Sequence, residues 1–228
     1  MRVLPGQASR LPPRARTVNR EQASADQRER IIFAGAALIA KRGFHGTTIE
    51  LIIRRAKVGY ATFYKNFSDK EELLLAIFDY AGVEVRRRMK DAIKQAGDSW
   101  TDQVAASLAA LFEMIAENPT FARVCLVESL SAGPGGASRY ERALTNFGPL
   151  LRPGREFNKN GANLPDTLES TLVGAVFWIA YQRLIVGEAD KLRGLLPETV
   201  ELVLSPYVGE EEAVRVAEMY AAPVGGSA

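Results

Sequence analysis

The chain has 228 residues, of which 47% are hydrophobic and 25% charged, and this composition excludes fibrous, collagen-like and disordered proteins. The longest uncharged run of its apolar C-terminal half, residues 170–182, is shorter than the roughly 18–20 residues of a membrane-spanning helix. One cysteine, Cys125, and one histidine, His45, allow no internal disulfide and few metal-ligand sets, so we expect no cofactor and no enzymatic activity. The N-terminal arginines precede no apolar signal segment, which favours a cytoplasmic protein without a membrane partner.

Charge is segregated along the chain. The formal net charge is +2, yet residues 1–67 carry 13 Lys and Arg against 4 Asp and Glu, while residues 68–228 carry 16 against 23. A basic block joined to an acidic one indicates a protein whose basic end meets a polyanion such as DNA. A solvated basic tail at residues 1–23 is the alternative source of part of this excess.

The first elements follow in order. Residues 1–23 combine prolines with scattered arginines and no helical period, which predicts a disordered basic arm. From Ser24 onward apolar residues recur at spacings of three and four, which predicts an all-α protein. Hydroxyls stand three residues before Gln or Glu at Ser24, Thr47 and Ser68, the capping-box pattern of a helix start. We therefore expect helices over residues 24–41, 47–55, 59–66 and 68–95.

Larger helices are expected beyond Gly97. The pattern predicts them over residues 99–117, 120–131, from about 138, over 164–186 and 197–207, and from 210. Pro149 and Pro153 either kink or break the helix that begins near residue 138, and the pattern does not decide between these outcomes.

Residues 47–67 have the spacing of a helix-turn-helix, with a turn at Ala56-Lys57-Val58. Phe63 and Phe67 would pack the back of the second helix onto the core. The groups expected to face DNA bases lie on its front, namely Gly59, Tyr60, Thr62, Lys65 and Asn66. Donors at helix starts are expected to contact phosphates, namely Thr47, Thr48 and Lys70. A short helical hairpin that only forms a core has the same pattern.

Several motifs stand in one order between residues 31 and 73: Gly43-Phe44, Thr47-Thr48, Thr62-Phe63-Tyr64 and Lys70-Glu71-Glu72-Leu73. Together they resemble the N-terminal DNA-binding domain of the TetR/AcrR family of transcriptional regulators. The resemblance implies a homodimer on a palindromic double-stranded DNA operator, with the third helix in the major groove. It also implies a helix-turn-helix domain over residues 24–67 and an effector-binding and dimerisation domain over 68–228, with 68–96 as the connecting helix.

Carried over to this sequence, the resemblance implies phosphate contacts by Thr48, Tyr64 and Lys70. We expect a ligand-responsive repressor, and the alternatives within the class are an activator and a regulator without a small-molecule effector. Two departures stand out. Lys57 occupies a turn position that is usually Gly, and a left-handed Lys there would cost about 1 kcal/mol. Gly59-Tyr60 replaces a common Ser-Lys or Ser-Arg, so the base preference does not follow from relatives.

Disordered arms of other DNA-binding folds enter the minor groove. The arm before Ser24 would do the same through its arginines, namely Arg10, Arg14, Arg16 and Arg20. A tail that adds only nonspecific charge is an equal alternative. Dimer contacts are expected from the apolar helices at 167–186 and 197–207. The residues expected on their contact faces are Leu168, Thr171, Leu172, Ala175, Val176, Ile179 and Arg183 on the first helix and Val200, Val203 and Leu204 on the second. The alternative is that these faces pack only within the monomer.

The remaining helices would enclose a pocket for a small apolar or aromatic effector. Its candidate lining residues are Trp100, Phe112, Met114, Phe121, Cys125, Phe147, Phe177, Trp178 and Tyr181. Arg123, Glu128 and Gln182 are polar residues in apolar helices that would orient such a ligand. A different class of function, an all-α carrier or enzyme with an incidental basic N-terminus, is disfavoured because His, Cys and paired carboxylates do not cluster.

Overall fold

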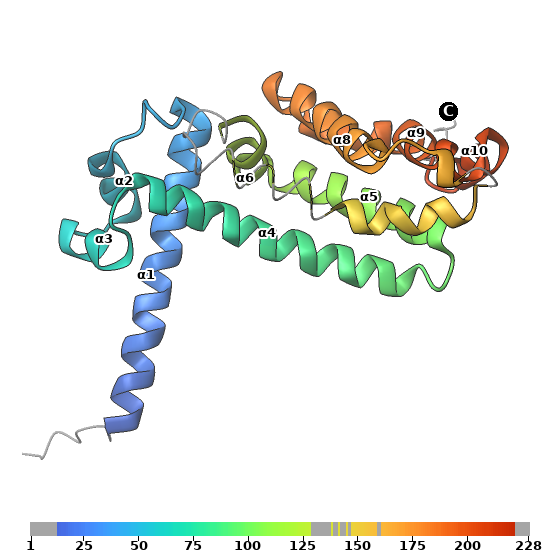
Figure 1. The fold of residues 1–228 in the computed structure, drawn as a ribbon. Helices are drawn as coiled ribbons and strands as arrows, with labels where there is room; N and C mark the ends of the chain where they lie inside the picture. The colour runs from blue at the N-terminus through green and yellow to red at the C-terminus, as the bar shows by residue number, and fades with distance from the viewer. Residues whose placement is uncertain are drawn as a thin grey trace, which may run out of the picture.

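The computed structural model describes residues 13–128, 138, 141, 145, 147–158 and 161–221, with side chains from residue 25 onward except that of Ala162. These residues form helices and turns and no strand, which confirms the predicted all-α class. Figure 1 shows helices α1 to α3 gathered at one end and α4 leading from them along a bundle of α5, α8, α9 and α10. None of the described helices combines the length and apolar character that crossing a membrane requires.

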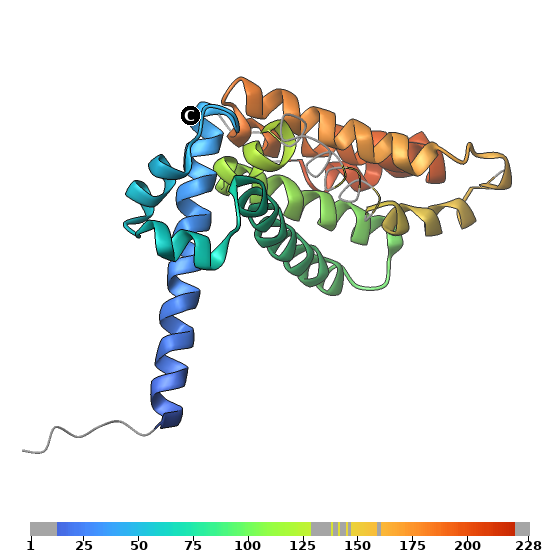
Figure 2. The same cartoon turned by 60° about the vertical axis from the view of Figure 1, so that its left-hand side comes forward.

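Helix α1 spans Pro13–Arg42, so both the predicted start at Ser24 and the predicted disorder of residues 13–23 are wrong. Proline is tolerated at a first helical position because its missing N–H needs no partner there, and no Gly or Pro follows before residue 35. The N-terminal half of α1 stands clear of the other helices in both views (Figures 1 and 2). Arg10 and the side chains of Arg14, Arg16 and Arg20 lie outside the described residues.

The helix-turn-helix consists of α2 (Ile49–Ala56) and α3 (Tyr60–Asn66). Both predicted capping boxes next to it are displaced by one residue. Thr48, not Thr47, caps α2 by accepting a hydrogen bond from the Leu51 N–H. Asp69, not Ser68, caps α4 (Lys70–Gln95) by accepting from the Glu72 N–H.

A first hydrophobic core holds α1, α2, α3 and the start of α4 together. Ile31, Ile52, Phe63 and Leu73 are fully buried in it. A Cβ on Gly35 would lie 2.8 Å from the Leu73 side chain, so glycine permits the close crossing of α1 and α4. We call residues 25–77 the head, because the first turns of α4 share its core.

A second core lies in the remaining helices, which we call the body. They are α5 (Trp100–Glu117), α6 (Pro119–Arg123), the π-helical η1 (Val124–Glu128), α8 (Leu168–Ile185), α9 (Leu196–Val208) and α10 (Glu210–Glu218). Three 3₁₀ segments accompany them, namely η3 (Arg152–Glu156), η4 (Gly161–Asn163) and η5 (Ala189–Leu195). Helical geometry continues through Pro149 to Leu151 and changes to 3₁₀ at Arg152. The helix therefore passes through Pro149 and ends before Pro153.

Tyr207 and Trp100 close the end of the body that is remote from the head. The Trp100 indole N–H donates to the Leu150 carbonyl over 2.9 Å, and its ring stands edge-on to Tyr207. The Tyr207 hydroxyl donates to Glu169, which Arg155 also holds at 2.7 Å. Burial, followed by the neighbouring Glu169 carboxylate, raises the pKa of Tyr207, so the hydroxyl stays protonated as a donor.

Candidate DNA-binding surface and ligand cavity

Helix α3 has a buried back and an exposed front. Phe63 is fully buried and packs against the Phe67 ring, which confirms their predicted place on the core side. On the front, Tyr60 and Tyr64 are 52% and 54% exposed, which is unusual for large rings in a folded domain. Lys65 lies beside them and is also exposed. The helix therefore presents two aromatic rings and a cation on the face turned away from the core.

The turn between α2 and α3 depends on a strained residue. Lys57 has φ 54° and ψ 50°, the left-handed conformation, and among the described residues no other non-glycine has a positive φ. Its N–H donates to the Arg54 carbonyl, while the Val58 N–H donates to Ile53, so the turn satisfies carbonyls at the end of α2. The Arg30 guanidinium donates to the Lys57 carbonyl over 3.2 Å and ties the turn to α1.

The predicted DNA contacts fall into three groups by exposure. Thr48, Gly59, Tyr60, Tyr64 and Lys65 are exposed. Thr62 and Asn66 are half-buried, and the Asn66 amide donates to the Thr62 carbonyl over 2.8 Å. Thr47 is buried, 1% exposed, and its hydroxyl donates to the Gly43 carbonyl over 2.9 Å. The Thr47 side chain therefore closes the end of α1 and does not face solvent, contrary to the sequence-based expectation.

Lys70 is half-buried and has partners within the head. Its ammonium donates to the Phe44 carbonyl over 2.6 Å and to the Thr47 carbonyl over 2.8 Å, and it lies 4.2 Å from the centre of the Phe44 ring. Burial lowers the pKa of this amine. Lys70 thus joins the start of α4 to the turn between α1 and α2, with only its third donor left for a phosphate.

A set of exposed cations surrounds the helix-turn-helix. None of them forms an ion pair with a described residue, so their charge is available to a polyanion. They are Arg28, Arg30, Lys41, Arg42, Arg54, Arg55, Lys57 and Lys65.

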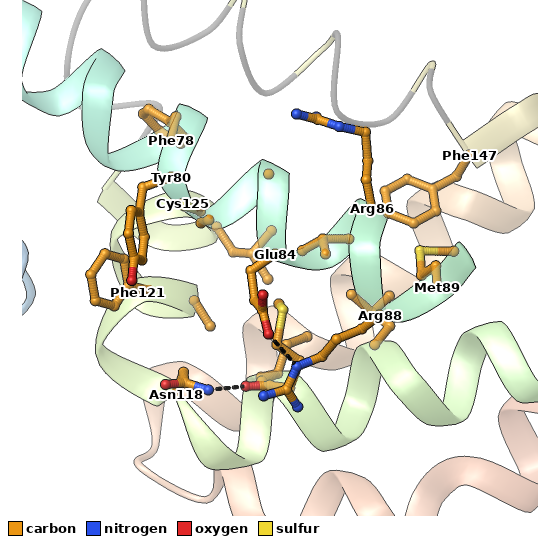
Figure 3. A pocket seen from close by; sticks show the side chains of 18 of the residues that line it. Phe78, Tyr80, Glu84, Arg86, Arg88, Met89, Asn118, Phe121, Cys125 and Phe147 are labelled. Atoms are coloured by element: carbon orange, nitrogen blue, oxygen red, sulfur yellow. Dashed lines mark hydrogen bonds and ion pairs between the residues drawn. The ribbon is translucent and has the colours of Figure 1, made fainter. Parts of the chain in front are cut away.

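The body contains a cavity of about 640 Å³ between α4, α5, α6, η1 and α8 (Figure 3). Its wall is mainly apolar. Where the cavity meets the head, the rings of Phe33 from α1, Tyr80 from α4 and Phe121 from α6 lie 5.1 to 5.3 Å apart. The volume is in the range of small-molecule sites.

Five of the nine predicted pocket residues line this cavity, namely Met114, Phe121, Cys125, Phe147 and Phe177. The other four do not. Trp100 and Phe112 are buried in the core of the body. Trp178 and Tyr181 stack on each other on α8, and Trp178 is 58% exposed. Burial among apolar groups raises the pKa of the Cys125 thiol to about 12, which keeps it a neutral wall group.

Sequence reasoning missed the wall that α4 contributes, because this helix was assigned only a connecting role. Its cavity residues recur at helical spacing, namely Phe78, Ala81, Val85, Met89 and Ile93, and this stripe was a readable signal. Charged residues flank it. On one side Glu84 pairs with Arg88 at 2.7 Å, and Arg88 pairs with Glu117 at 2.6 Å. Hydrogen bonds from Arg87 and Arg88 lower the pKa of Glu84 to about 2.

Arg123 and Glu128 join the body to the head and do not line the cavity, contrary to the expectation that they orient a ligand. The Arg123 guanidinium donates to the Ala40 carbonyl over 3.1 Å and to the Leu184 carbonyl over 2.9 Å. The Glu128 carboxylate accepts from the Phe44 N–H over 3.2 Å. The π-helical segment η1 carries both Glu128 and the cavity residue Cys125, so one short element contacts both cavity and head. Gln182 is exposed on α8.

The head matches a model of a known protein family. Residues 31–77 match the family model described as bacterial regulatory proteins, tetR family. A curated HTH-type transcriptional regulator from Haemophilus influenzae, itself uncharacterised, is 28% identical over 110 residues, which are 48% of this chain and 53% of the relative. The chain thus spans about half the length of the curated relative it matches.

Solved structures share the fold at about 20% identity. The fatty acid degradation regulator FadR from Bacillus halodurans superposes with a TM-score of 0.67, covering 78% of this chain and 94% of that one. FadR from Bacillus subtilis in complex with stearoyl-CoA gives 0.65, covering 78% and 97%, and a gamma-butyrolactone receptor gives 0.62, covering 87% and 97%. Residues 31–77 therefore match the tetR family model, and the chain shares its fold with these solved regulators.

Proposed function

We propose that this protein is a ligand-responsive transcriptional regulator, a repressor, that binds a palindromic operator as a homodimer in the cytoplasm. The exposed front of α3, set among unpaired cations in a domain that matches the tetR family, is the observation that carries the proposal. Nucleic acid binding by a basic helix-turn-helix combines phosphate contacts that position the protein with base contacts that specify the site.

In the proposed complex α3 lies in the major groove. Tyr60, Thr62 and Lys65 face base edges near the exposed Gly59 backbone, while Thr48 and Tyr64 contact phosphates. A lysine in this position suits guanine, whose O6 and N7 accept hydrogen bonds in the major groove. Asn66 and Lys70 are bound within the head and support the surface through their partners.

The dimer interface is proposed on the outer face of α8 and α9. Of the residues expected there from the sequence, five are buried in the monomer core, namely Leu172, Val176, Val200, Val203 and Leu204. A different face exposes apolar groups, with Trp178, Ile185 and Leu202 between 45% and 58% exposed. A self-complementary apolar face is what a two-fold dimer requires.

Ligand response is proposed to run through the cavity. A ligand that prefers one arrangement of α4 and η1 shifts the dimer between operator-competent and incompetent spacings of its heads, by no more than its differential affinity for the two. The Phe33, Tyr80 and Phe121 rings and the Arg123 and Glu128 contacts connect the cavity to the head. The regulators solved with this fold include one bound to stearoyl-CoA, which supports an apolar effector here.

Selection of bound duplexes from a random DNA pool tests the proposal. A palindrome should be enriched, and its affinity should fall steeply as salt is raised, because bound phosphates release counterions. Lys65→Ala and Tyr64→Phe should weaken binding, whereas Lys94→Ala, an exposed lysine at the far end of α4, should leave it unchanged. Enrichment of no sequence, or equal effects of Lys65→Ala and Lys94→Ala, would refute it.

The alternative of an all-α carrier shares the cavity. A carrier would retain a ligand on purification and would ignore DNA at all salt concentrations. The same selection experiment therefore separates the two functions.

A further inference from the structure

The cavity is apolar along its length but its charged rim is asymmetric. On α4, Glu84 and Arg88 flank the apolar stripe on one side, where carboxylates neutralise the arginine. Arg86 and Lys90, one turn apart, flank the stripe on the other side and also line the cavity. Neither forms a hydrogen bond or ion pair with a described residue. The second side thus carries two uncompensated positive charges.

The position of Arg86 is set by its neighbour one turn earlier. A Cβ on Gly82 would lie 3.2 Å from an Arg86 guanidinium nitrogen, so the side chain lies back along α4 over the bare glycine. Figure 3 shows Arg86 on the side of Phe147, apart from the Glu84 and Arg88 pair. The guanidinium therefore lies back along α4 at the cavity rim, and the Arg86 side chain is exposed to solvent there.

Arg86 and Lys90 are four residues apart, and two like charges at this spacing repel each other and destabilise a helix. An anion between Arg86 and Lys90 would remove that repulsion and accept charge-assisted hydrogen bonds. The apolar wall below, including Val85, Met89 and Ile93, would meanwhile exclude a compact hydrophilic anion such as free phosphate. The two requirements together describe one kind of molecule.

We infer that the cavity binds an amphiphilic anion, a molecule with an extended apolar chain and an anionic end group, and that Arg86 and Lys90 bind the end group. A carboxylate on the chain itself and a phosphate-bearing carrier attached to the chain share this chemistry. The inference rests on the proposed role of the cavity as the ligand site and names the ligand class.

Calorimetric titration of the full chain without DNA tests this class directly. The probes are dodecanoate, dodecanoyl-CoA, 1-dodecanol and dodecyltrimethylammonium, which share a chain and differ in end group. We expect both anions to bind more tightly than the alcohol and the cation to bind most weakly. The tighter of the two anions identifies the end group. Equal affinities for anion and alcohol, or no binding of any probe, would overturn the inference.

Substitutions locate the end group. Arg86→Met with Lys90→Met should weaken dodecanoate binding by about tenfold and leave 1-dodecanol unchanged, which shows that the cavity itself is intact. Lys94→Met, on the same helix but outside the cavity wall, is the matched control and should change nothing. Arg86→Glu with Lys90→Glu should reverse the preference toward dodecyltrimethylammonium. Loss of alcohol and anion binding together, or an unchanged preference, would contradict the assignment.

Operator binding is measured separately. If dodecanoate binds as described but does not alter operator affinity, the ligand class stands and the proposed coupling fails. If the chain binds no DNA at all, the calorimetric result is unaffected.

Discussion

Lys57 shows how one residue determines a turn. Its left-handed backbone lets two N–H groups cap the end of α2 and aims the chain into α3. A residue with a Cβ is strained there, whereas glycine is not. Lys57 therefore adopts the left-handed conformation that the sequence led us to expect, and its backbone is strained.

Lys57→Gly should stabilise the protein by about 1 kcal/mol, because it removes this strain. Urea unfolding at neutral pH measures the change. Lys57→Ala is the matched control, since it removes the same charge and keeps the Cβ, and its stability should stay near that of the wild type. A gain in Lys57→Ala as large as that in Lys57→Gly would show that charge and not strain is responsible.

Lys70→Met should lower the free energy of unfolding by roughly 2 kcal/mol, because Met keeps the apolar stem beside Phe44 and loses both donated hydrogen bonds. Lys65→Met, at an exposed position of α3, should leave stability unchanged and weaken DNA binding. Thermal unfolding and operator titration of both variants separate the two roles. Unchanged stability of Lys70→Met would mean that its carbonyl contacts contribute little.

At the scale of elements, α4 has two functions along one helix. Its first turns complete the core of the head with Leu73 and Ile77, and its later turns form a wall of the cavity. The α6 helix continues directly into the π-helix η1, and the two contact the head through Arg123 at the end of α6 and Glu128 at the end of η1. Short π-helical segments are frequent at functional sites. A ligand that moves α4 or η1 therefore acts on the head without an intervening loop.

The 3₁₀ segment η3 packs so closely on the body that its glycine is required. A Cβ on Gly154 would lie 2.3 Å from the Trp100 ring and 2.7 Å from the Tyr207 ring, whereas a Cβ on Gly148 meets nothing within 4 Å. Gly148 lies in the helical residues just before η3 and Gly154 lies within η3, so the two glycines form a matched pair.

Gly154→Ala should lower the unfolding free energy by about 1 to 3 kcal/mol, the usual cost of overpacking. Gly148→Ala should raise it by up to about 1 kcal/mol, because alanine favours the helix. Calorimetric melting of both variants gives the comparison. Similar melting temperatures for the two would show that the rings yield to the added methyl group.

At the scale of the whole molecule, charge and apolar surface are separated. The excess of positive charge lies in residues 1–67, with 13 Lys and Arg against 4 Asp and Glu, and an exposed apolar face lies on α8 and α9 of the body. A dimer joined through that face would carry its two heads at fixed separation, which is the requirement for reading two half-sites. Oligomeric state and DNA recognition are thus linked in the proposed function.

Trp178→Asp should shift the dimer toward monomers by roughly thirtyfold or more, since it places a charge where a large ring would be desolvated. Sedimentation at micromolar concentration measures this equilibrium. Val83→Asp is the control, because Val83 is 59% exposed on α4, away from α8. If the wild type sediments as a monomer, or both variants behave alike, the interface lies elsewhere.

The sequence by itself determined the all-α class, the helix-turn-helix and most helix ends to within a few residues. It also determined the buried back of α3 at Phe63 and Phe67. These features depend on periodicity, capping and turn residues, which act over one or two helical turns. The start of α1 was the exception, because no residue between Pro13 and Ser24 ends a helix.

Only the tertiary structure decided which face of each helix is covered. It buried Thr47, gave Lys70 two carbonyl partners, left Trp178 exposed and made α4 a cavity wall with Arg86 and Lys90 at its rim. Each of these depends on a partner far along the chain. Local pattern shows that a helix has an apolar side, but packing between distant helices determines whether that side meets a core, a cavity or solvent.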